Sequence, residues 1–106
     1  MILTTTNAIE GFKVTEYKGI VTGISYNTSY KNMSFKEMFN ISKYYEIYEE
    51  GMQSIKEEAF QKLTANAKKM NANAIVGITV DLEIAANSTT ILASVTGTAV
   101  HIIPEK

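Results

Sequence analysis

A long amphipathic helix is the strongest pattern in the sequence. Through the middle of the chain, apolar residues recur at steps of three and four, the spacing of one face of an α-helix. They are Tyr48, Met52, Ile55, Ala59, Leu63, Ala67 and Met70. The other side is charged or polar, and Glu58 precedes Lys62 by four residues, the favourable order for a helical ion pair. We predict a helix from a break near Ser42 to about Met70, with Gly51 as its weakest point.

The segment before this helix predicts a long strand and two shorter elements. Residues 12 to about 28 are rich in β-branched and aromatic residues and predict one bent strand. Gly19 and Gly23 inside it indicate a bulge or a place where another backbone comes close, rather than a phosphate loop. Residues 2–6 suit a short edge strand, and a capping-box pattern predicts a short extra helix over residues 34 to about 41.

Two more strands are predicted after the helix. Asn71-Ala72-Asn73 supplies the stop, because asparagine tolerates the left-handed conformation found past helix ends. From Val76 to Ile84 apolar and polar residues alternate, and this apolar face is expected to meet the helix. Asn87-Ser88 predicts a turn, and residues 89–103 a last strand that Pro104 closes.

The order strand, helix, strand, strand predicts an α+β fold in a single domain over residues 1–106. We expect a three-stranded antiparallel sheet packed by the long helix, with the short N-terminal strand beside it. Such a small sheet leaves its edges exposed, and a closed homo-oligomer is the simplest way to cover them.

Composition narrows the classes of function. The chain has 106 residues, no cysteine, and 10 Lys+Arg against 11 Asp+Glu for a net charge of −1. A chain without cysteine has no thiolate metal site or cysteine nucleophile, which agrees with a cytoplasmic protein. All its basic residues are lysine, which with the near-zero charge argues against nucleic acid as a partner. We also expect neither a signal peptide nor a membrane span.

The carboxylates Asp81 and Glu83 are the candidate metal ligands, because residues two apart on a strand share a face. They suit hard cations such as magnesium or calcium, and a solvated strand face is the alternative interpretation. Pairing about the predicted turn places Glu83 opposite Leu92 and His101 opposite Ala74. Asp81 and His101 would then lie roughly 25 Å apart within one chain.

No nucleotide-binding or hydrolase motif is present, so catalysis would depend on the only histidine, His101. Apolar neighbours favour a strand or interface role for it. If the protein is an enzyme, Glu16, Tyr17 and His101 of different chains would form the site.

Aromatic residues are unusually dense at the start of the long helix. They are Tyr44, Tyr45 and Tyr48, with Phe35 and Phe39 upstream. Tyrosine is favoured at interfaces, but core packing explains the cluster equally well. Its role stays open.

Short motifs at both ends of the chain are typical of one protein family. At the front they are Thr4-Thr5-Thr6, Ile9-Glu10-Gly11, Glu16-Tyr17, Gly19, Val21 and Gly23. In the second half they are Tyr48-Glu49, Lys56, Ala59-Phe60, Leu63, Ala67, Ala72-Asn73-Ala74-Ile75-Val76-Gly77, Asp81, Glu83 and Gly97-Thr98-Ala99-Val100. The chain resembles the YbjQ family, small bacterial and archaeal proteins described as heavy-metal-binding. The resemblance implies a dodecin-like β-α-β-β subunit assembled into a pentamer.

The chain differs from the family pattern in the middle. Ser42-Lys43-Tyr44-Tyr45 stands where members commonly carry Gly-Gly-Arg-Ser, so neither a ligand role for that loop nor a metal site is transferred. We therefore expect a non-enzymatic cytoplasmic homo-oligomer that binds a small ligand or metal ion between subunits, with no established cofactor. An enzyme with an intersubunit site and a purely structural scaffold are the alternatives.

Overall fold

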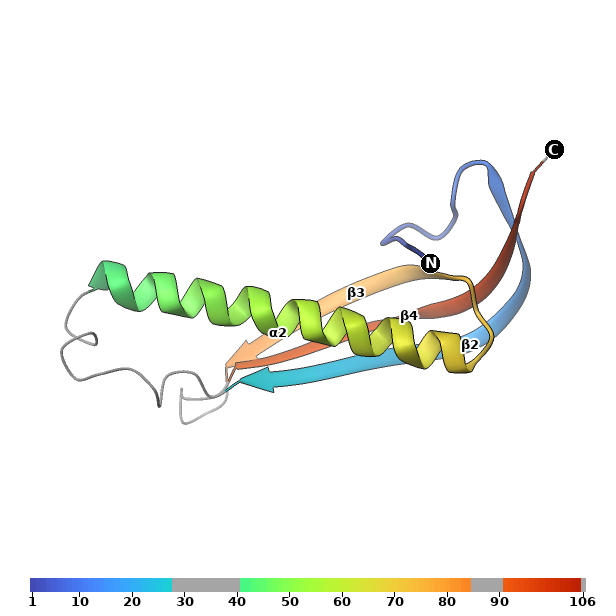
Figure 1. The fold of residues 1–106 in the computed structure, drawn as a ribbon. Helices are drawn as coiled ribbons and strands as arrows, with labels where there is room; N and C mark the ends of the chain where they lie inside the picture. The colour runs from blue at the N-terminus through green and yellow to red at the C-terminus, as the bar shows by residue number, and fades with distance from the viewer. Residues whose placement is uncertain (28–40, 85–90, 106) are drawn as a thin grey trace.

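The computed structural model describes residues 1–27, 41–84 and 91–105 and confirms the α+β class. A long helix lies along a four-stranded sheet of order β1-β3-β4-β2 (Figure 1). The elements in chain order are β1 (Ile2–Leu3), β2 (Phe12–Asn27), α2 (Ile41–Lys69), β3 (Ala74–Ile84) and β4 (Ile91–Pro104). The predicted short helix over residues 34–41 and the turn at Asn87-Ser88 lie outside the described residues, apart from Ile41, where α2 begins.

The sheet is mixed and four-stranded, which corrects the prediction of three antiparallel strands. β1 joins the same sheet by pairing in parallel with the start of β3, with Ile2 opposite Ala74. The chain continues this contact beyond β1, since Gly77 N–H donates to Thr6 C=O at 2.8 Å. A strand as short as β1 cannot stand alone, so it takes the nearest unpaired backbone, which is this edge of β3.

The helix matches its predicted bounds closely, and Gly51 does not interrupt it. The apolar side of the helix faces the sheet, with Ile55 at 1% exposure and Ala59, Leu63 and Ala67 at 0%. The predicted i,i+4 pair forms, with Lys62 Nζ 3.5 Å from the Glu58 carboxylate. Asn71 ends the helix in the left-handed conformation, at φ 63°.

Gly19 and Gly23 take the two roles predicted for a glycine in this strand, a bulge and a close approach of another backbone. Gly19 lies at a register shift of β2 against β4 with φ 129°, so it marks a bulge. Gly23 faces α2, where a side-chain carbon would lie 2.6 Å from the backbone nitrogen of Leu63. The strand and the helix therefore pack backbone to backbone at Gly23.

The expected apolar face of β3 is divided between two sides of the sheet. A register shift lies between Val76 and Thr79, and Gly77 there adopts φ 61°. Because side chains alternate along a strand, the extra residue moves Val76 to the face away from α2. Beyond the shift, Val80 and Leu82 face the helix side but are 41% and 36% exposed, since α2 packs mainly on β2 and β4.

Two apolar clusters hold the sheet, one on each face. The larger lies between α2 and the strands, and the smaller is formed by Ala74, Val76, Val100 and Ile102. The smaller one is covered by Ile9, Phe12 and Val14 near the N-terminus. Among the described residues, this cover reaches only the end of the sheet where the helix stops.

Candidate functional site

Large apolar side chains lie uncovered along β2, on the face away from α2. They are Tyr17 at 72% exposure, Ile20 at 78%, Ile24 at 51% and Tyr26 at 68%, and we call them the apolar stripe. The residues that alternate with them, Val21, Gly23 and Ser25, are buried beneath the helix. An isolated apolar residue on a surface needs no explanation, but four large exposed ones along one face of a strand, interrupted there by Thr22, mark a contact surface.

β2 is also an edge strand, and α2 covers part of its backbone. Asn66 Nδ2 donates to the carbonyl of Thr22 at 2.8 Å, and Lys62 Nζ donates to the carbonyl of Ile24 at 3.0 Å. These carbonyls are two residues apart, so they point to the same side of the strand. The helix thus fills acceptors along the outer edge and limits simple strand addition there, while the apolar stripe stays open.

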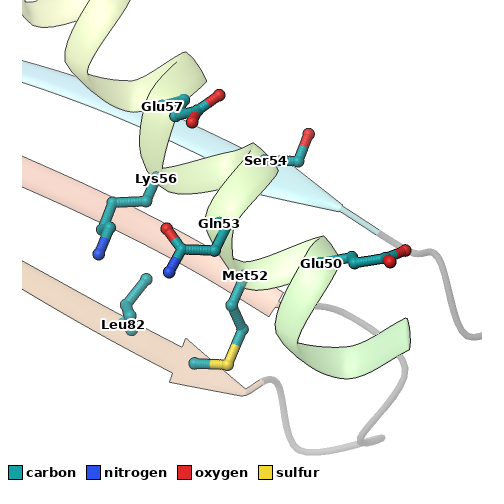
Figure 2. Close-up of a pocket in the computed structure, with 7 residues that line it drawn as sticks. All are labelled: Glu50, Met52, Gln53, Ser54, Lys56, Glu57 and Leu82. Atoms are coloured by element: carbon teal, nitrogen blue, oxygen red, sulfur yellow. The ribbon is translucent and has the colours of Figure 1, made fainter. Parts of the chain in front are cut away.

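A groove of about 700 Å³ runs between the first half of the described helix and β3. Figure 2 shows Met52, Gln53 and Lys56 pointing toward Leu82 of β3, while the other lining residues point away from it. Those others are Glu50, Ser54 and Glu57. The groove exists because α2 is displaced toward β2, so no described element covers this part of β3.

A polar cluster spans β2 and β4 near the end of the sheet. Thr15 Oγ1 lies 3.0 Å from His101 Nδ1, and Glu16 stands opposite His101 in the strand register. Tyr17 stands opposite Val100. Because successive strand residues point to opposite faces, the side chain of Tyr17 points away from those of Glu16 and His101. The structure brings Glu16 and His101 together but does not place all three groups on one face of a single chain.

Lys18 lowers the pKa of Glu16. Lys18 Nζ lies 2.8 Å from Glu16 Oε2, and this hydrogen bond, with the charge of Lys18, holds the pKa of Glu16 below its ordinary value. His101 adds a smaller lowering of the same pKa. A carboxylate with a lowered pKa in the folded state favours folding near neutral pH and loses that contribution as the pH falls through its folded pKa.

We predict that Lys18→Met raises the pKa of Glu16 toward the ordinary glutamate value. The substitution removes the first and second causes of the lowering, the hydrogen bond and the charge. The side-chain carboxyl carbon shift of Glu16, followed by NMR against pH, measures the change. Lys13→Met is the control, because Lys13 is not among the causes of the lowering. An unchanged titration in Lys18→Met would show that Lys18 does not set this pKa.

Asp81 and Glu83 are exposed neighbours on the face away from the helix. Glu83 stands opposite Leu92 as predicted, whereas Ala74 stands opposite Val100 rather than His101, because the bulge in β3 shifts the register by one. Across the described ranges, no three His, Cys, Asp or Glu side chains come together as metal ligands. The metal candidates Asp81 and Glu83 stay a prediction.

Sequence reasoning missed the apolar stripe and the groove. One signal for the stripe was present, because Ile20, Ile24 and Tyr26 alternate with Val21, so both faces of that strand carry apolar residues. A strand of this pattern needs cover on both sides. The side chains of Tyr44, Tyr45, Tyr48, Phe35 and Phe39 lie outside the described part of the chain, so their role is untested.

Comparison with known proteins shows the family to which the chain belongs. The YbjQ family model, described as "Putative heavy-metal-binding", matches residues 1–103, and the chain belongs to this family. A UPF0145 protein of Clostridium kluyveri is 40% identical over 105 residues, covering 94% of this chain and 97% of that protein. A UPF0145 protein of Picosynechococcus sp. is 35% identical over 111 residues, covering 96% and 99%.

A solved structure supports the fold. The crystal structure of a DUF74-family protein of unknown function from Pediococcus pentosaceus matches with a TM-score of 0.62 at 19% identity. The match covers 97% of this chain and 98% of that one. Among the helical residues that the structure describes, no segment is long and apolar enough to cross a membrane.

Proposed function

We propose that the protein is a non-enzymatic cytoplasmic homo-oligomer that binds a small ligand or ion where its subunits meet. The subunit is dodecin-like, and the assembly is a pentamer, as the family resemblance implies. Its biological partner is then another copy of the same chain, with neither nucleic acid nor membrane involved.

The observation that carries this proposal is the apolar stripe. Exposing Tyr17, Ile20, Ile24 and Tyr26 to water costs free energy that a monomer cannot recover, and unpaired, uncovered strands favour aggregation. Each large apolar side chain that becomes fully buried contributes about 1.5 to 3 kcal/mol. A defined assembly buries the stripe and limits its size by symmetry.

We place the ligand between subunits because the described part of one chain has neither an enclosed cavity nor a complete set of ligating groups for it. Within the described residues the groove beside α2 is open, and the acidic pair Asp81 and Glu83 has no third ligand. A second subunit would bring further polar groups to a site at the border between the two chains. The description of the family as heavy-metal-binding makes an ion one of the ligands to consider.

Ile24→Lys is the test of the assembly. Static light scattering on the unmodified protein is expected to give a single species of several times 11.7 kDa. In Ile24→Lys a charge replaces an apolar group in the buried contact, so we expect only monomer at low micromolar concentration, with the far-ultraviolet circular dichroism unchanged.

Ile24→Val is the matched control, since it keeps the position apolar and β-branched and should keep the assembly. A strictly monomeric unmodified protein at micromolar concentration would overturn the proposed function. An assembly that survives Ile24→Lys intact would show that the stripe is not its contact surface.

A further inference from the structure

We propose that the apolar stripe of one copy docks into the groove between α2 and β3 of the next copy. The contact then joins two different surfaces. Each subunit inserts its apolar stripe into the groove of one neighbour, and its own groove binds the stripe of the other neighbour. This inference rests on the proposed function, because it names the surfaces through which the homo-oligomer forms.

The groove is the receiving surface because β3 is uncovered there in two directions. Toward the helix, Val80 and Leu82 are 41% and 36% exposed. Along its outer edge, β3 is paired by β1 at Ala74 and Ile75, and the following N-terminal residues reach only Gly77 and Ile78. From Thr79 onward no other described segment pairs with this edge, unlike the outer edge of β2, where α2 already fills two carbonyls.

The chemistry of the two surfaces matches. Met52 and Leu82 give the groove an apolar lining, and methionine adapts its shape to an incoming side chain. Gln53 and Lys56 point into the same space (Figure 2) and offer polar groups at its border. The stripe brings Ile24 to the apolar part, and Tyr26 buries its ring while its hydroxyl meets polar groups.

One end of the apolar stripe, at Ile24 and Tyr26, lies at the level of the groove. Ile24 is opposite Ser94 of β4, and Ser94 is opposite Asp81 of β3. Tyr26 is aligned in the same way through Leu92 with Glu83. Leu82 therefore lies at the level between Ile24 and Tyr26, on the other side of the sheet.

This alignment favours a closed ring. A contact between two different surfaces repeats from copy to copy, and it forms a ring only when the repeat has no translation along the axis. Rotation about an axis parallel to the strands brings Ile24 of one copy to the level of Leu82 of the next without such a translation. Surfaces at different levels would instead generate an open filament.

Cysteine cross-linking tests the pairing, and the absence of cysteine from the chain means that every cross-link comes from the introduced residues. The variants are Ile24→Cys, Leu82→Cys and the double variant, each treated with a short bismaleimide under non-denaturing conditions. In the double variant we expect a ladder of covalent species on denaturing gels, ending at the number of subunits in the assembly. Each single variant is expected to remain uncross-linked.

A mixture of the two single variants, dissociated and reassembled together, should give covalent dimers and no longer ladder. A dimer formed by Ile24→Cys alone would show that two stripes pair with each other and would overturn the inference. An oligomeric double variant that gives no ladder would also overturn it, because another occupant then fills the groove.

The Ile24→Cys, Val80→Cys pair, also one residue apart in level through Ser94 and Val95, repeats the test if the first double variant does not fold. Light scattering on each sample separates the two claims. A monomer by light scattering, together with no cross-link, is failure of the proposed function. An intact oligomer with the wrong cross-links is failure of this inference alone.

Discussion

Gly23→Ala is expected to lower the free energy of unfolding by about 3 kcal/mol or more, because it forces extra volume into a packed contact. The added carbon would lie 2.6 Å from the backbone nitrogen of Leu63 and 3.1 Å from its Cα, and closer still to the carbonyl oxygen of Ala59. All three are backbone atoms of α2, so no side-chain rotation relieves the overlap. The helix would have to move away from β2, which opens the main core along its length.

Urea unfolding followed by circular dichroism measures this loss, at one fixed protein concentration. Gly11→Ala is the matched control, because this variant also replaces a glycine. Gly11 has open space around it and adopts φ 85°. The control is expected to cost only the backbone strain, about 1 to 2 kcal/mol. If Gly23→Ala cost no more than Gly11→Ala, the backbone-to-backbone contact between β2 and α2 would be wrong.

The element order could be predicted from the sequence because each element carries its own local signal. The helix stripe from Ile55 to Ala67 has a period that only a helix satisfies, and the structure buries all of it. The left-handed Asn71 and the bulge at Gly19 follow from backbone preferences of single residues. Such signals act within a few residues, so no knowledge of the tertiary structure is needed.

The sheet's details could not be predicted because they depend on contacts between distant parts of the chain. The bulge near Gly77 moves Val76 to the other face. The sequence gives no sign of this bulge, because apolar and polar residues alternate through it without a break. The parallel pairing of β1 depends on where β3 begins, far away in the sequence. Local patterns contain neither fact.

The candidate site was harder still, since it follows from where the helix lies across the sheet. The displacement of α2 toward β2 leaves Leu82 half-exposed although its strand pattern predicts burial. The same displacement lets Lys62 and Asn66 reach the edge of β2. A single sequence gives the helix its apolar face but does not say which two strands that face will cover.

Leu63→Ala is expected to destabilise the fold by about 2 to 5 kcal/mol, which is the cost of a cavity in a core that cannot collapse. Leu63 is fully buried, and the glycine at position 23 already brings β2 as close to the helix as the backbones allow. The midpoint of urea unfolding should therefore fall at every protein concentration.

Leu82→Ala removes the same atoms from a side chain that is 36% exposed in one chain. We expect it to change the stability of the subunit by less than about 1 kcal/mol, while it moves dissociation of the assembly to higher protein concentration. Sedimentation over a dilution series measures that second effect. Equal losses of subunit stability in the two variants would show that Leu82 belongs to the core of the single chain, and its place in the groove would then have no role in assembly.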